Sequence, residues 1–135
     1  INRAREFYEN VMELEVMMDH GTHVSFDNVL SLQQDYPGLV GAELIMREKP
    51  NNFQMYYETE DLDACEKKLE AVGDLEFLHH PKAYPWGQRV MRFYDYDSYI
   101  IELAESMESV ARRFLAQGLS AAETAERTMY PVEFI

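Results

Sequence analysis

The stretch Tyr84-Pro-Trp-Gly-Gln-Arg-Val-Met-Arg-Phe-Tyr-Asp-Tyr-Asp-Ser-Tyr-Ile-Ile-Glu-Leu103 decides the fold. It predicts two apolar strands over 88–94 and 99–104, joined by a tight turn at 95–98. Aspartate and serine suit such a turn because their short side chains bond the nearby backbone. One carboxylate, Glu102, lies within the apolar second strand, where burying a charge is costly unless something pairs with it. Glu102 is therefore the first candidate for a functional residue.

An internal repeat predicts that the chain is built from two similar halves. Leu14-Glu15-Val16 follows a predicted helix over 2–12, and Leu75-Glu76-Phe77 follows a second predicted helix over 61–72. The apolar faces of the two helices match when these segments are aligned. We expect Asn2 to cap the first helix, as Asp61 caps the second. Each half then reads as a strand, a helix and three strands, and the first half lacks its opening strand.

The pattern becomes helical after residue 104. An apolar stripe predicts a helix over 107–117 that Gly118 ends, and Ser120 with Glu123 forms a capping box for a short helix over 121–128. We expect this tail to be a helical cap or a dimer arm that packs its Met/Phe stripe on the sheets.

The quoted stretch resembles the last hairpin of the vicinal-oxygen-chelate superfamily. That superfamily includes glyoxalase I, extradiol dioxygenases, and the fosfomycin and bleomycin resistance proteins. Its members often carry Pro-Trp-Gly before the hairpin, Asp-Pro-Asp-Gly at the turn, and an Ile-Glu pair after it. Here the turn is Asp95-Tyr96-Asp97-Ser98, without the proline and the glycine.

The resemblance implies an α+β fold in which two βαβββ modules form a half-open barrel around a pocket. The first strand of the first module would precede Ile1 and is missing from this chain. We expect a glyoxalase/bleomycin-resistance-like domain over 1–104, with halves of about 1–50 and 51–104, and a helical C-terminal extension over 105–135.

The resemblance also implies where a metal would bind. In metal-using members, four ligands come from the first and last strands of each half, commonly a His and a Glu from each. Glu102 matches the last strand of the second half, Gln54 takes a His position on the first strand, and Ser31 is the repeat partner of Glu102. We therefore expect Glu102 and Gln54 as ligands if a divalent Zn, Ni, Mn or Fe binds, with Glu102 as the catalytic residue.

Aromatic and basic side chains complete the predicted pocket. We expect Tyr56 and Trp86 to line it, together with Gln54 and Ser31, because aromatic rings suit a flat, partly polar molecule. Either Arg89 or Arg92 could pair with Glu102 or meet an anionic ligand, and strand parity does not choose between them. The four histidines lack metal-binding spacing: His23 opens a strand, His79 and His80 end one before Pro81, and His20 lies in a loop. His23 or His79 could still line the mouth of the pocket.

Composition restricts the partners. The 135 residues carry 25 acidic and 12 basic side chains, a formal charge of −13, which argues against nucleic acid or an anionic membrane as partner. No apolar stretch approaches the ~20 residues that span a bilayer. Cys65 is the only cysteine, which fits a reducing compartment. We expect a cytoplasmic protein with a small-molecule ligand, and a homodimer as is common in the family.

Three functions stay open. A metal-assisted lyase, isomerase or dioxygenase would use Glu102 as ligand or base. A metal-free binding protein of the bleomycin-resistance kind would hold an amphipathic molecule between aromatic walls. A regulatory module would work through its C-terminal helices, and it has the least support in the residues.

Overall fold

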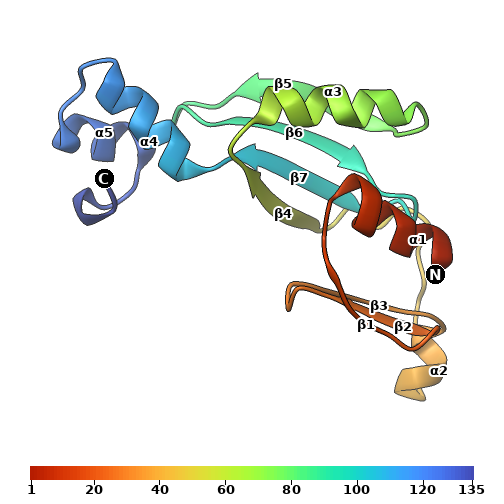
Figure 1. Cartoon of the computed structure of the whole chain (residues 1–135). Coiled ribbons are helices and arrows are strands. Elements are labelled where there is room, and N and C mark those ends of the chain that lie inside the picture. Colours follow the sequence, from red (N-terminus) through yellow and green to blue (C-terminus); the bar gives the residue numbers. More distant parts are fainter. The chain divides into compact units, whose positions relative to one another are not determined.

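Two separate sheets organise the computed structural model, which describes all of residues 1–135 (Figure 1). One compact unit holds residues 1–52 with the turn at 95–99, and the other holds residues 53–94 and 100–135. None of the helices combines the length and the apolar character needed to cross a bilayer.

The first unit contains a three-stranded antiparallel sheet in the order β1-β2-β3. It begins with a short α-helix that continues as a π-helix, and buried Phe7 and Tyr8 from this helical segment join Val24 and Phe26 of the sheet in the core. Its elements are α1 (Asn2–Glu6), the π-helix η1 (Phe7–Val11), β1 (Val16–Asp19), β2 (His23–Phe26), β3 (Leu30–Gln33) and α2 (Tyr36–Val40).

The second unit contains a four-stranded sheet in the order β4-β7-β6-β5. The outer strand β4 runs parallel to β7, whereas β7, β6 and β5 are antiparallel neighbours. Helix α3 covers one face of this sheet, and the C-terminal helices follow β7 (Figure 1). Its elements are β4 (Gln54–Thr59), α3 (Leu62–Val72), β5 (Phe77–Ala83), β6 (Arg89–Tyr94), β7 (Ile100–Glu105), α4 (Met107–Ala116), α5 (Ala121–Thr128) and the 3-10 helix η2 (Val132–Phe134).

These elements confirm the predicted α+β class and the two-module plan. The second unit contains a complete βαβββ module, and the first contains the same elements without an opening strand. Neither sheet closes into a barrel. The predicted boundary between residues 1–104 and 105–135 stays a prediction.

Two local predictions are wrong. Asn2 does not cap the first helix, because the helix already includes it and Ile1 occupies the capping position. His79 and His80 do not end a strand, because β5 continues through Pro81 to Ala83. Proline is tolerated there because the β5–β6 register shifts between His79 and Lys82, where no regular ladder bond from residue 81 is required.

The turn between β6 and β7 packs against the first helical segment. The Tyr8 hydroxyl donates to Asp95 Oδ2 at 2.5 Å, and Asp95 Oδ1 accepts from the backbone of Asp97 and Tyr99. Burial raises the pKa of Asp95 above its ordinary value, although these three hydrogen bonds act in the opposite direction. The net effect is a carboxyl group that holds its proton more tightly in the folded chain than in the unfolded one.

This difference predicts a pH-dependent contribution to stability. With a raised folded pKa, the contribution of Asp95 is full below the unfolded pKa and is lost as pH rises through the folded value. We expect the free energy of unfolding of the wild type, minus that of Asp95→Asn, to decrease as the pH rises above about 4, the ordinary pKa of an aspartate. Urea unfolding at a series of pH values measures this difference. Glu126→Gln, an exposed change on α5 that touches no partner of Asp95, should give a flat difference, and an equally flat one for Asp95→Asn would contradict the prediction.

Candidate functional site

The candidate site lies on the face of the second sheet that α3 leaves open. Glu102, in the middle of β7, is directly opposite Arg92 on β6 and is the register partner of Tyr56 on β4. Strand alternation places Gln54 on this face with Tyr56, and Met91 and Phe93 on the other. Glu102 is only 7% exposed, so its charge requires a partner.

Arg92 supplies that partner and also binds Gln54. Arg92 Nη2 donates to Glu102 Oε2 at 2.9 Å, and Arg92 Nε donates to Gln54 Oε1 at 3.0 Å. The Gln54 amide in turn donates to Glu102 Oε2. Three side chains from three strands therefore form a closed triangle of hydrogen bonds, and Glu102 Oε1 takes no part in it.

Two further side chains hold the guanidinium in place. Arg92 Nη1 donates to the Tyr84 hydroxyl at 2.6 Å and lies 3.0 Å from His79 Nε2. The guanidinium carbon also lies 5.6 Å from the centre of the Tyr84 ring. Burial alone would lower the pKa of Arg92, but its hydrogen bond with Tyr84 and the charge of Glu102 raise the pKa above its ordinary value. Arg92 is thus a permanent, fixed positive charge.

Tyr56 presents an aromatic surface beside this triangle. The residue is 48% exposed, while its hydroxyl donates to Glu58 Oε1 at 2.8 Å and accepts from Gln88 Nε2 at 3.1 Å. Burial of the hydroxyl, followed by its bond to Glu58, raises the pKa of Tyr56 to about 12. The phenol therefore stays neutral at physiological pH, and the open ring face is available to a flat molecule.

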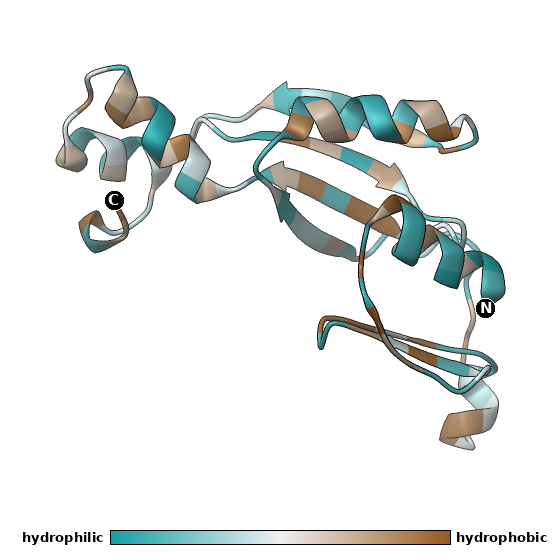
Figure 2. Ribbon diagram, in the orientation of Figure 1, coloured by the Kyte–Doolittle hydropathy of each residue, from teal (hydrophilic) through white to brown (hydrophobic).

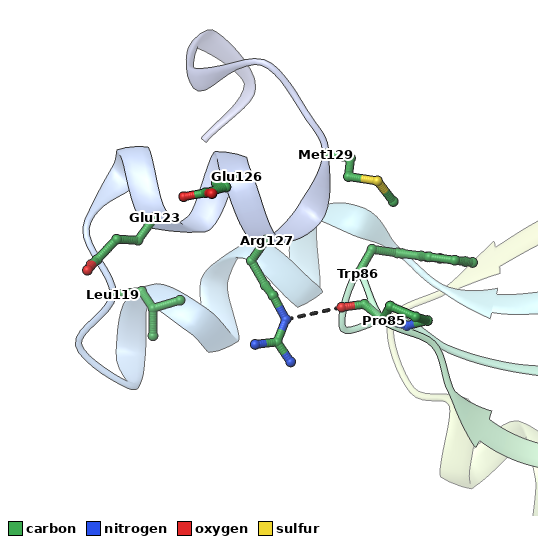
Figure 3. Close-up of a pocket in the computed structure, with 7 residues that line it drawn as sticks. All are labelled: Pro85, Trp86, Leu119, Glu123, Glu126, Arg127 and Met129. Atoms are coloured by element: carbon green, nitrogen blue, oxygen red, sulfur yellow. Dashed lines mark hydrogen bonds between the residues drawn. The ribbon is translucent and has the colours of Figure 1, made fainter.

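Trp86 lies in the loop between β5 and β6, outside the hydrogen-bonded triangle of Glu102, Gln54 and Arg92. Its ring stacks on Tyr84 with centroids 4.9 Å apart, and its indole N–H donates to Gln88 Oε1 at 2.8 Å. It packs on an apolar cluster of α4 and lines a hollow of roughly 440 Å³ with residues of the C-terminal tail (Figure 3). The hollow's lining is Pro85, Trp86, Leu119, Glu123, Glu126, Arg127 and Met129.

Gly87 lets the Trp86 loop approach α4 closely. Its φ of +86° is unfavourable for other residues, and a Cβ there would lie 2.2 Å from Phe114 Cζ. Ser31 belongs to the first unit, where its hydroxyl is 3.1 Å from that of Ser25 and it lines a separate hollow of about 520 Å³.

The site thus unites three of the predicted residues, Gln54, Tyr56 and Glu102, and joins Arg92, Tyr84 and His79 to them. Gln54 and Glu102 are brought together, and of the two arginines left open by the sequence, Arg92 is the partner of Glu102. Arg89 instead pairs with Asp63 and Glu105. Tyr84 was not predicted as a site residue, and His79 was expected only at the mouth of the pocket. Cross-strand position is the signal that finds His79, since it is the register partner of Arg92.

Two of the donor atoms expected to bind a metal, Gln54 Oε1 and Glu102 Oε2, are already bonded. The Gln54 carbonyl accepts from Arg92, and Glu102 Oε2 accepts from both Gln54 and Arg92. The guanidinium of Arg92 occupies the position beside the Glu102 carboxylate where a metal ion would have to bind. Since a divalent ion would have to displace a fixed positive charge, Gln54 and Glu102 as arranged here do not fit a metal site.

Comparisons with known proteins give the family. Residues 1–108 match the family described as a Glyoxalase-like domain, so the chain belongs to this family within the vicinal-oxygen-chelate superfamily. No curated protein sequence matches the chain.

Solved structures share the fold. A protein of unknown function from Agrobacterium tumefaciens str. C58 is 29% identical, with 78% of this chain and 85% of that chain covered and a TM-score of 0.70. A glyoxalase/bleomycin resistance protein/dioxygenase from Nocardioides is 19% identical, with 77% and 74% covered and a TM-score of 0.62. A lactoylglutathione lyase from Agrobacterium tumefaciens is 18% identical, with 78% and 84% covered and a TM-score of 0.58.

The ion pair at the centre of the site leads to a stability prediction. Arg92→Met leaves Glu102 buried without its cation, and breaking such a pair should lower the free energy of unfolding by about 3 kcal/mol. The double variant Arg92→Met/Glu102→Gln should recover much of this loss, because no unpaired charge remains. Denaturant unfolding of the wild type, both single variants and the double variant measures the coupling.

Arg47→Met is the matched control, since Arg47 is exposed in the first unit and its loss should change stability by less than about 0.5 kcal/mol. A double variant as unstable as the sum of the two single variants would show that Arg92 and Glu102 do not depend on each other.

Proposed function

We propose that this chain is a member of the glyoxalase-like family that binds a small molecule at the Glu102 site without a metal there. Its ligand would lie on the open face of the second sheet, against Glu102, Gln54 and Tyr56. The observation that carries the proposal is Arg92, which supplies a positive charge between Gln54 and Glu102, the two residues expected at the family's metal-ligand positions.

The hydrogen-bonding positions that the site leaves free suggest the chemical class of the ligand. Glu102 Oε2 is already used twice, whereas Oε1 can accept a further hydrogen bond from a ligand N–H or O–H. Tyr56, the register partner of Glu102 on the neighbouring strand, adds an exposed aromatic side chain. A flat molecule with an amine, amide or hydroxyl donor matches both features. The overall charge of −13 also favours neutral or cationic ligands over anionic ones.

A metal-assisted lyase or dioxygenase is the second candidate. It is supported by the retained carboxylate at Glu102 and by structural likeness to a lactoylglutathione lyase and to proteins of the glyoxalase/bleomycin resistance protein/dioxygenase superfamily. In such an enzyme Glu102 would act as metal ligand or base, which requires Arg92 to withdraw from it.

Two predicted ligand-binding residues lie outside the Glu102 triangle. Trp86 and Ser31 each line a hollow of their own unit, so their contact with the same ligand stays a prediction. For the cellular context we propose the cytoplasm, supported by the single, half-buried Cys65.

Metal content and ligand binding together test the proposed function. Elemental mass spectrometry should find no Zn, Ni, Mn or Fe that depends on Glu102. Any such metal in the purified chain should be equally abundant in Glu102→Gln. A panel of aromatic amines and phenols, screened by thermal shift and titrated by calorimetry, should contain binders whose affinity falls about tenfold in Glu102→Gln. Glu108→Gln, an exposed change on α4, should bind as the wild type does.

The opposite results would support the enzyme. Stoichiometric metal that is lost in Glu102→Gln, together with lactoylglutathione lyase or ring-cleaving activity, would overturn metal-free binding. A binder that is indifferent to Glu102→Gln would remove Glu102 from the site.

A homodimer is the proposed assembly. The support is the apolar surface that the first unit exposes on β1 and on the turn between β2 and β3. Met17, Met18 and Val29 are each about half or more exposed there. Light scattering after size exclusion should give twice the chain mass of 15.8 kDa, and Met17→Lys should shift it toward the monomer. A wild type that elutes at the monomer mass at micromolar concentration would contradict the dimer.

A further inference from the structure

A second group of chemically active side chains lies on the α3 side of the second unit. Glu66 and Glu70 are one turn apart on α3, so their carboxylates share one side of the helix. His80 reaches them from β5, and its neighbour His79 points to the opposite face toward Arg92. One ligand atom from each of Glu66, Glu70 and His80 lies within 4.8 Å of the others.

The separations between these atoms match those around a small metal ion. His80 Nδ1 is 3.2 Å from Glu66 Oε2 and 3.6 Å from Glu70 Oε1. In a tetrahedral zinc site with bonds of about 2.0–2.2 Å, two ligand atoms lie about 3.4 Å apart. The two distances from His80 Nδ1 are therefore close to those around a tetrahedral ion, and both carboxylates lie within reach of an ion bound to this nitrogen.

The imidazole is also held in position by its own strand. The His80 ring stacks on Phe77, with centroids 4.7 Å apart and planes inclined by 20°. Asp63, earlier on the same helix, differs from Glu66 and Glu70 because its carboxylate is taken by Arg89. The basic side chain that faces Glu66 and Glu70 is an imidazole, which binds metals through a ring nitrogen when neutral.

We propose that Glu66, Glu70 and His80 form a binding site for a transition-metal dication of the zinc type. The imidazole favours such an ion over Mg²⁺ or Ca²⁺, which prefer all-oxygen ligands. Three protein ligands leave one position for water, and the ion would clamp α3 to the edge strand β5. This site is separate from the Glu102 face and does not rest on the proposed function.

Calorimetric titration of the full chain with ZnCl₂ tests the site. We expect one Zn²⁺ per chain, with an affinity that falls at least tenfold in His80→Ala and in Glu70→Gln, and no comparable binding of Mg²⁺. Zn²⁺ should raise the Tm of the wild type and not that of His80→Ala. Glu70 is exposed on the helix surface, so Glu70→Gln keeps the test valid if His80→Ala folds poorly.

Two control variants locate the ion. His20→Ala removes an exposed imidazole of the first unit and should leave Zn²⁺ binding unchanged, as should Glu102→Gln. Binding that persists in both His80→Ala and Glu70→Gln, that is lost instead in Glu102→Gln or His20→Ala, or that is absent from the wild type would overturn the proposal.

Discussion

The second unit depends on pairing the two carboxylates of a strand that is buried along its whole length. All six residues of β7 are buried, and β7 is mostly hydrophobic in Figure 2, yet two of the six are glutamates. Glu102 is paired with Arg92. Glu105 is paired with both Arg89 and Arg113, at 2.5 Å each. Because an unpaired buried charge is so costly, these pairs restrict the β6–β7 register and the position of α4.

The two glutamates nevertheless differ in how many of their oxygens are free to accept a further hydrogen bond. Both oxygens of Glu105 are used, one by each arginine, and Arg113 also bonds the Gly87 carbonyl, so the group ties α4 to the end of the sheet. Only one oxygen of Glu102 accepts from its protein partners, whereas Oε1 does not. Burial alone therefore does not distinguish the two carboxylates. The free acceptor position on Glu102 does, and it is the reason why we propose Glu102 as the ligand-binding one.

The sequence predicts those parts of the molecule that depend on local signals. The capping box at Ser120 and the helix start at Asp61 need only a few neighbouring residues, and both predictions are confirmed. The sequence did not identify which arginine pairs with Glu102, because the predicted second strand begins at residue 99, one residue before β7 begins. Tyr94 pairs with Ile100, and this single shift decides which β6 residue faces Glu102. The grouping of His80 with α3 depends on tertiary packing, which spacing along the chain does not contain.

The internal repeat explains why the charged chemistry is confined to one half. Ser31 is the repeat partner of Glu102, and its register partner on β2 is Ser25, just as Arg92 is the register partner of Glu102. The first unit therefore has two hydroxyls, 3.1 Å apart, where the second has a carboxylate and a guanidinium. A pair of hydroxyls satisfies its own hydrogen bonds without a counter-charge and brings no strong metal ligand. A metal site with strong donors from both halves would therefore lack its ligand from the first half. The charged pair of the second sheet stands alone, and it presents one polar group within the second unit.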